Sequence, residues 1–171
     1  MKKYSLLLIV LFFVACSYRI TKNADGEPIV DEKRYSFTKK PSTEDLKIVD
    51  TTAVYVQIFN LEDSNEQERS NPMTIGFHND GYFKSGSVKF YGKFDSKRHK
   101  NSVYYGGRYY LEGNKIFLEA FYPNSGGATN YYVKEISKGR VVNDTLRLTI
   151  FGRKTRYVKR DLSEIRLGNS N

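Results

Sequence analysis

The chain contains short runs in which apolar and polar residues alternate, and most of these runs lie between residues 46 and 160. Alternation with a period of two places successive side chains on opposite faces of a β-strand. The clearest run covers residues 145–150, where Leu146, Leu148 and Ile150 share one face. Other runs are rich in β-branched and aromatic residues, which favour strands. Strands are therefore predicted at residues 49–59, 73–77, 87–94, 103–111, 115–122, 130–136, 145–150 and 153–160.

Turn sequences separate these runs and indicate how the strands are connected. Asn, Asp and Gly tolerate the positive φ that tight hairpins need. Three hairpins are predicted, at Asp80-Gly81, Gly113-Asn114 and Asn143-Asp144. The only helical candidates are short, at residues 42–47 and 161–166. We therefore expect an all-β fold, an antiparallel meander of about eight or nine strands closed into a barrel, with a β-sandwich as the alternative.

The N-terminus has the pattern of an export signal. Lys2 and Lys3 are followed by an apolar run over residues 6–14. This run is about half the roughly 20 residues that a membrane-spanning helix needs, so a signal peptide over residues 1–15 fits better. The only cysteine of the chain, Cys16, follows directly.

The sequence Val14-Ala15-Cys16 resembles the lipobox of bacterial lipoproteins, although Phe13 stands where that family usually has an aliphatic residue. The resemblance implies cleavage before Cys16 and acylation of its thiol, which would anchor the protein in the cell envelope. Ser17, rather than an aspartate, follows the cysteine, and no acidic run comes after it. In this family these features imply the outer membrane of a Gram-negative bacterium, at the periplasmic face rather than the cell surface.

Three further regions follow the signal peptide. Residues 16–45 are polar and rich in turn residues, which predicts a lipidated N-terminus and a tether of roughly 30 Å. Part of the tether, near residues 34–37, is expected to touch the domain. Residues 46–162 form the predicted β domain, and residues 163–171 form a polar tail.

Three segments of the β domain resemble the small lipocalin-like lipoproteins of Gram-negative envelopes. They read GFHNDGYF, GGRYYLEGNKIFLEAF and GRVVNDTLRLTI, and the resemblance covers residues 50–160. The Gly-x-Trp signature of better-known lipocalins is absent, because the chain has no tryptophan. The resemblance implies a calycin-type barrel and no single activity, since such barrels hold different ligands or none.

The sequence contains no recognisable catalytic or metal-binding motif. Of the two histidines, His78 lies beside a turn and is expected to be solvated, while His99 lies among lysine and arginine residues. Zinc sites need several His or Cys ligands at set spacing, and none is present. Three acidic residues on predicted strands, Glu112, Glu119 and Glu135, are expected to be outward charges. We therefore expect neither an enzyme nor a cofactor or metal.

Lysine and arginine number 28 against 19 aspartate and glutamate residues, and two basic clusters cover residues 97–100 and 153–160. An exported lipoprotein does not normally meet nucleic acid, so nucleic acid is not an expected partner. Anionic envelope components, such as phosphorylated headgroups, acidic glycans or an acidic protein surface, are one interpretation. The favoured interpretation is a solvated face whose charges protect a strand edge.

Two functions remain open for the barrel. One is a binding module, anchored in the membrane, for an apolar or amphipathic small molecule or for an envelope protein. The other is a structural or assembly protein whose barrel is filled by its own side chains. The candidate interior residues for a ligand are Phe90, Tyr105, Tyr109, Ile116, Leu118, Leu146 and Leu148.

Overall fold

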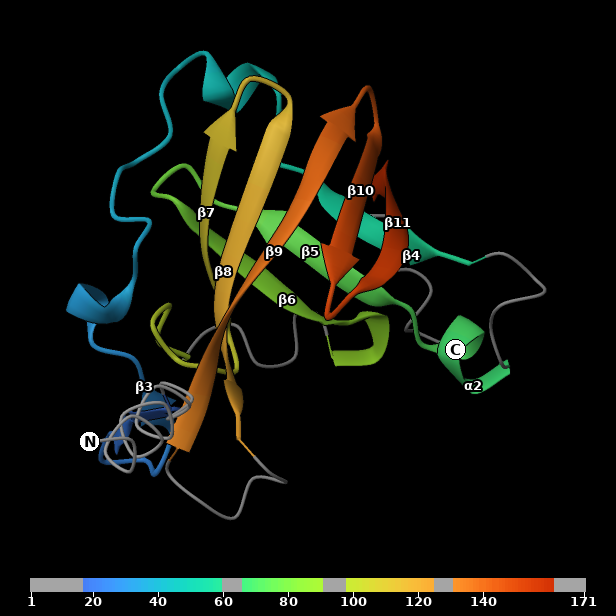
Figure 1. Cartoon of the computed structure of the whole chain (residues 1–171). Coiled ribbons are helices and arrows are strands. Elements are labelled where there is room, and N and C mark those ends of the chain that lie inside the picture. Colours follow the sequence, from blue (N-terminus) through green and yellow to red (C-terminus); the bar gives the residue numbers. More distant parts are fainter. Residues whose placement is uncertain (1–16, 60–65, 91–97, 125–130, 162–171) are drawn as a thin grey trace, which may run out of the picture.

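The computed structural model describes residues 17–59, 66–90, 98–124 and 131–161. Eight strands follow one another around a closed barrel (Figure 1). They are β4 (Val54–Ile58), β5 (Met73–Phe77), β6 (Tyr82–Ser87), β7 (Gly106–Glu112), β8 (Lys115–Pro123), β9 (Tyr131–Val142), β10 (Thr145–Ile150) and β11 (Arg153–Arg160). Each pairs antiparallel with the next, and β11 pairs with β4 to close the ring. The all-β barrel is confirmed, and the sandwich alternative is wrong.

The three predicted hairpins connect strands of the barrel as expected. Asn143 has a φ of 52° and Gly113 a φ of 55°, so both turns use the left-handed conformation that Asn and Gly tolerate. The β5–β6 turn likewise places Gly81 at a φ of 88°. A fourth tight hairpin, between β10 and β11, has positive φ at Phe151 and Gly152. The turn chemistry therefore fixes the register of the meander.

Short elements lie outside the barrel. They are β1 (Ser17–Arg19), β2 (Thr21–Lys22), β3 (Pro28–Ile29), the 3₁₀ turns η2 (Glu32–Arg34), η3 (Asp45–Lys47) and η4 (Val88–Phe90), and helix α2 (Glu66–Ser70). The helical candidate at residues 42–47 is confirmed as η3, whereas residues 162–166 of the other candidate lie outside the described residues. Within the described ranges, no helix has both the length and the apolar character needed to cross a membrane.

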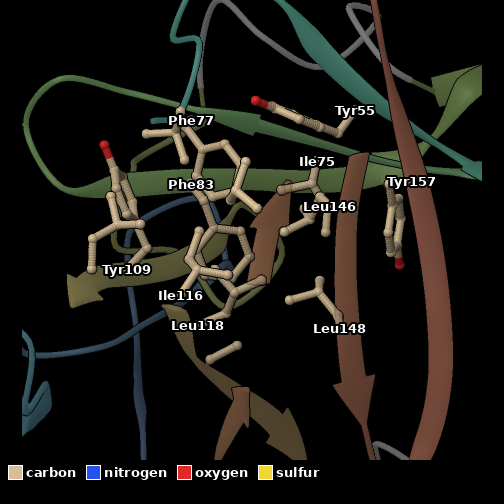
Figure 2. Close-up of a cluster of buried hydrophobic side chains, with 14 residues drawn as sticks. Tyr55, Ile75, Phe77, Phe83, Tyr109, Ile116, Leu118, Leu146, Leu148 and Tyr157 are labelled. Carbon is tan, nitrogen blue, oxygen red and sulfur yellow. The ribbon is translucent and has the colours of Figure 1, made fainter. Parts of the chain in front are cut away.

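Aromatic and aliphatic side chains fill the barrel near the β7–β8 turn (Figure 2). Tyr55, Phe77 and Tyr109 pack edge to face, with ring centroids 5.5 and 5.0 Å apart. The Tyr109 hydroxyl donates a hydrogen bond to the His78 carbonyl oxygen at 2.8 Å, so its polar end is satisfied. Val49, which precedes β4, is fully buried in the same cluster. This end of the barrel is therefore a filled core.

The first described residues form a second layer on the outside of the barrel (Figure 1, blue). β1 pairs with β9, and Ile20, Val30 and Tyr35 are buried against Phe121 and Tyr132 of the outer strand faces. The sequence predicts a flexible tether over residues 16–45, and the described part, residues 17–45, differs because its few apolar side chains are buried on the barrel. The expected contact near residues 34–37 is present.

Glu119 explains how this polar segment is held. Its side chain points outward from β8 but has 0% exposure, because the segment covers it. The amides of Ser36 and Phe37 donate hydrogen bonds to its carboxylate at 2.8–3.0 Å, and the Lys134 ammonium lies 3.1 Å away. The expected outward orientation of Glu119 is therefore present, but the covering segment removes its charge from solvent.

Several predicted strands have different bounds, and β4 and β9 differ from the expected 49–59 and 130–136. Of the strand expected at residues 87–94, only Ser87 belongs to a strand, β6; Val88–Phe90 form the turn η4, and residues 91–94 lie outside the described residues. The strand expected at residues 103–111 begins only at Gly106, because residues 103–105 form a turn. A Cβ on Gly106 would lie 2.3 Å from the Phe83 carbonyl oxygen, so β6 and β7 approach too closely there for any side chain.

Candidate ligand-binding site at the open end of the barrel

The end of the barrel opposite the filled core contains a cavity of about 560 Å³. It lies where β4, β6, β8 and β10 end and where β5 and β11 begin. Its lining comes from inward-facing positions of these strands, from β9 and from the β10–β11 turn. The lining residues are Gln57, Met73, Thr74, Ile75, Phe83, Ser85, Leu118, Ala120, Tyr122, Ser137, Ile150, Phe151, Arg153, Thr155 and Tyr157.

The inner part of the cavity is apolar. Ile75, Phe83, Leu118 and Tyr157 line it and also belong to the buried core cluster (Figure 2). Ala120 faces the same space with only a methyl group. Because alternate positions of a strand face the same side, these residues enclose one continuous apolar surface. An apolar group placed there would be removed from water.

Aromatic rings stand at the rim of the cavity. Tyr122 and Phe151 pack edge to face with centroids 4.8 Å apart, and Phe151 is 60% exposed. Phe151 has a φ of 47°, which is uncommon for a bulky residue and is imposed by the tight hairpin. Met73, 42% exposed, also belongs to the lining. The rim therefore presents apolar surface to solvent.

A few polar groups accompany this apolar lining. Thr74 and Thr155 donate their hydroxyl hydrogens to backbone carbonyls within the barrel wall. Burial raises the pKa of the Tyr122 and Tyr157 hydroxyls, which stay neutral at neutral pH. Arg153 is exposed and is the cationic member of the lining. The site therefore combines an apolar interior with one positive charge at an exposed position.

The structure brings most of the predicted interior residues together. Tyr109, Ile116, Leu146 and Leu148 lie in the buried core cluster, and Leu118 lies both in that cluster and in the cavity lining. Their predicted inward orientation is confirmed. Whether they contact a ligand stays a prediction.

The remaining predicted site residues lie elsewhere. Tyr105 is buried outside this cluster, and its hydroxyl lies 2.7 Å from the Nε2 atom of His78. His78 is half-buried rather than solvated, and burial lowers its pKa. Cys16 and the side chain of Phe90 lie outside the described residues.

Several lining residues were not predicted. Tyr157 and Thr155 lie in a strand dominated by basic residues, and only the alternation of residues 153–160 could have shown that they face inward. Phe151 belongs to a turn without a strong hairpin motif. In the described part of the chain no three His, Cys, Asp or Glu side chains form a group that could hold a metal ion.

No family model and no curated protein matches the chain. One solved structure that resembles it is a lipocalin-like protein from Bacteroides thetaiotaomicron, 15% identical in sequence. The match covers 66% of this chain and 99% of that protein, with a TM-score of 0.38.

Proposed function

We propose that the protein is a lipid-anchored lipoprotein of the cell envelope whose barrel binds an amphipathic molecule in the cavity at its open end. The observation that carries the proposal is the 560 Å³ cavity with its apolar interior. Its volume lies within the range of about 300–1,000 Å³ that is typical of small-molecule sites. The proposal is one of binding and not of catalysis.

The chemistry of the lining favours a ligand with an apolar chain and an acidic group. The apolar interior supplies a favourable environment for a hydrocarbon chain, at about 25 cal/mol for each Å² removed from water. Arg153 offers a planar guanidinium that can bind a carboxylate through two parallel hydrogen bonds. A fatty acid or an acyl chain with an anionic headgroup fits both features.

A thermal-shift experiment with matched ligands tests this function. A chain that begins at Ser17 keeps every described residue and avoids the detergent that an acylated protein needs. Dodecanoic acid at 100 times its dissociation constant should stabilise the folded state by about 2.7 kcal/mol. Dodecanol should bind more weakly, and Arg153→Gln should remove that difference because both ligands then meet a neutral rim.

A variant with a filled cavity provides the structural control. Ala120→Leu adds three carbon atoms at a position that lines the cavity, so it should abolish the shift with dodecanoic acid. Val142→Leu, at an exposed position outside the cavity, should leave the shift unchanged. If Ala120→Leu folds normally and still responds like the wild type, the ligand does not occupy this cavity.

Anchoring is supported by the sequence at Cys16 and has its own test. Cys16→Ala should abolish labelling by an alkyne fatty acid and release the protein from the membrane fraction. Equal labelling of wild type and variant would disprove acylation at this residue. Separation of inner and outer membranes, followed by protease treatment of intact cells, tests the proposed outer-membrane location and periplasmic face.

A further inference from the structure

Six basic residues gather on the outer surface of four neighbouring strands, β8 to β11. They line a groove of about 680 Å³, whose lining also includes Phe117, Gly139, Leu148, Thr149 and Thr155. The six are Lys115, Lys138, Arg140, Arg147, Lys154 and Arg156. They occupy the outward positions of strands whose alternate residues face the interior, and of the residues that line the groove Thr155 also lines the ligand cavity.

Strand register places four of these cations in one row. Arg140 lies opposite both Lys115 and Arg147, and Arg147 lies opposite Arg156. With neighbouring strands about 4.8 Å apart, the row extends over roughly 14 Å. Lys138 and Lys154 flank Thr149 two residues further along the strands. The cations are therefore held at regular spacing by the backbone.

This arrangement is unfavourable for the protein alone. Like charges directly opposite each other on neighbouring strands destabilise a sheet. The only acid in register with this row is Glu112, which lies opposite Lys115 at its edge. Across the described ranges, the ion pairs that are found engage other cations than these six. Within the described residues, no ion pair therefore offsets the repulsion between the cations of this row.

Protection of a strand edge does not explain the row either. Basic residues often mark strands whose edges would otherwise pair with another chain. Here β10 is paired on both sides at Arg147, β11 is paired on both sides at Arg156, and β9 is paired on both sides where it carries Lys138 and Arg140. Edge protection therefore does not account for Arg147 and Arg156, whose strands are paired on both sides at these residues. An external anion would relieve the repulsion within the row.

We propose that this groove binds an acidic polysaccharide chain. The hollow shape suits an extended polymer better than the flat surface of a bilayer. The step between cations is comparable with the length of one sugar ring, so successive acidic groups can meet successive strands. Arg140, Arg147 and Arg156 provide guanidinium groups that bind carboxylate or sulfate through paired hydrogen bonds.

Aromatic rings at one end of the groove add to this fit. Phe117 lines the groove in the same row as Lys138, and Tyr110 lies opposite it on β7 with ring centroids 6.1 Å apart. Phe37 stacks on Tyr110 at 5.8 Å and packs against the edge of Phe117 at 6.4 Å, so a sugar ring would pack on the surface of Phe117 that lines the groove. Single-stranded nucleic acid instead needs aromatic platforms for successive bases, and these rings lie at one end rather than between the cations.

The test compares polymers on the full chain purified in a neutral detergent. The probes are heparin and polygalacturonate as acidic polysaccharides, a single-stranded oligodeoxynucleotide, and mixed micelles containing phosphatidylglycerol. Wild type should bind the polysaccharides at about 0.15 M salt, with affinity falling as salt rises. Tighter binding of the oligonucleotide or the micelles, or no binding of either polysaccharide, would overturn the proposal.

Paired variants locate the binding surface. Arg147→Glu with Arg156→Glu should weaken heparin binding at least tenfold. Lys22→Glu with Lys33→Glu makes the same change in net charge at exposed positions away from the groove and should change binding less than twofold. Equal losses in the two double variants would show that net charge, not the groove, attracts the polymer, and would overturn the proposal.

A neutral variant separates binding from folding. Arg147→Gln should weaken heparin binding and, at the same time, raise the melting temperature of the free protein, because it removes repulsion from Arg140 and Arg156. A lower melting temperature would contradict the repulsion argument. The cavity variant Ala120→Leu should leave heparin binding unchanged, so failure of this inference and failure of the proposed ligand cavity are distinguishable.

Discussion

Replacing Glu119 with alanine should loosen the N-terminal segment from the barrel. The Glu119 carboxylate is fully buried and joins two parts of the chain. It accepts hydrogen bonds from the backbone amides of Ser36 and Phe37, and it pairs with Lys134 on the neighbouring strand. The alanine variant would leave two amide donors without their acceptor and Lys134 without its counter-ion, although the ammonium would still donate to the Arg34 carbonyl and the Ser36 hydroxyl.

The magnitude follows from these contacts. Removing one partner of a buried ion pair typically costs about 3–5 kcal/mol. A single hydrogen bond to a charged group is worth about 1.5–3 kcal/mol, but neighbouring contacts do not add. The Lys134 side chain keeps 21% of its exposure, so water partly solvates its charge in the variant. We therefore expect Glu119→Ala to lower the free energy of unfolding by about 3 kcal/mol.

Urea denaturation measures this change, and the exposed ion pair between Glu44 and Lys47 provides the control. These two side chains are 78% and 66% exposed at a separation of 2.7 Å. Glu44→Ala should cost less than about 1 kcal/mol because water screens the pair. Glu119→Gln keeps one acceptor oxygen, so its loss in the free energy of unfolding should lie between the losses for Glu119→Ala and Glu44→Ala. Hydrogen exchange of the Ser36 and Phe37 amides should accelerate in Glu119→Ala.

Two results would refute this reasoning. One is a loss for Glu119→Ala that equals the loss for Glu44→Ala, which would mean that burial gives the carboxylate no special weight. The other is unchanged exchange at the amides of Ser36 and Phe37. That result would mean that the segment is held by its apolar contacts, chiefly those of Tyr35 and Phe121, whose rings pack edge to face at 5.3 Å.

Three further perturbations follow from the barrel. Leu148→Ala should lower the free energy of unfolding by about 2–5 kcal/mol in urea titrations, because the side chain is only 3% exposed. Gly139→Ala should lower the melting temperature sharply, because its Cβ would lie 2.0 Å from the Arg147 carbonyl oxygen, whereas Gly86→Ala meets no atom within 4 Å and should be neutral. Burial lowers the pKa of His78, so as the pH falls its imidazole is protonated in the unfolded chain before it is protonated in the folded protein. The free energy of unfolding should therefore decrease as the pH drops below about 6.5, and His78→Asn should flatten that part of the curve of stability against pH.

The sequence predicts the barrel well because its two strongest signals are local. Alternation correctly orients Leu146 and Leu148 inward, and Asn or Gly at the turns gives the β5–β6, β7–β8 and β9–β10 hairpins. Each of these features depends only on residues a few positions apart. Closure of the barrel follows from the number and spacing of the predicted strands, although the final pairing of β11 with β4 joins residues far apart in the sequence.

The N-terminal layer could not be predicted in the same way. Residues 17–45 are mostly polar, and their apolar side chains, such as Ile20 and Val30, follow no periodic pattern. Burial of Glu119 depends on amides that lie 82 and 83 residues away in the chain. No local pattern carries information about such partners. A polar composition therefore suggested a tether where the structure has a packed covering.

The cavity was also hidden in the sequence, for a different reason. Alternation shows which side chains face inward but not whether they fill the space between them. The open end is hollow partly because small residues, Ala120 and Ser137, face inward there, while Tyr55, Phe77 and Tyr109 fill the other end. The interior residues predicted from the sequence include Leu118, which lines this cavity, and Tyr109, which belongs to the filled end.

Strand β11 shows how one alternating pattern can serve two proposed sites. Tyr157 lines the cavity, Lys154 and Arg156 line the outer groove, and Thr155 contributes to both linings. A slip of one residue would exchange the two faces and put cations into the apolar interior, where an unpaired charge is very costly. The same alternation therefore opposes register errors and places Tyr157 and Arg156 on opposite faces of the strand. For this reason substitutions at Tyr157 and Arg156, although adjacent in sequence, should affect different ligands.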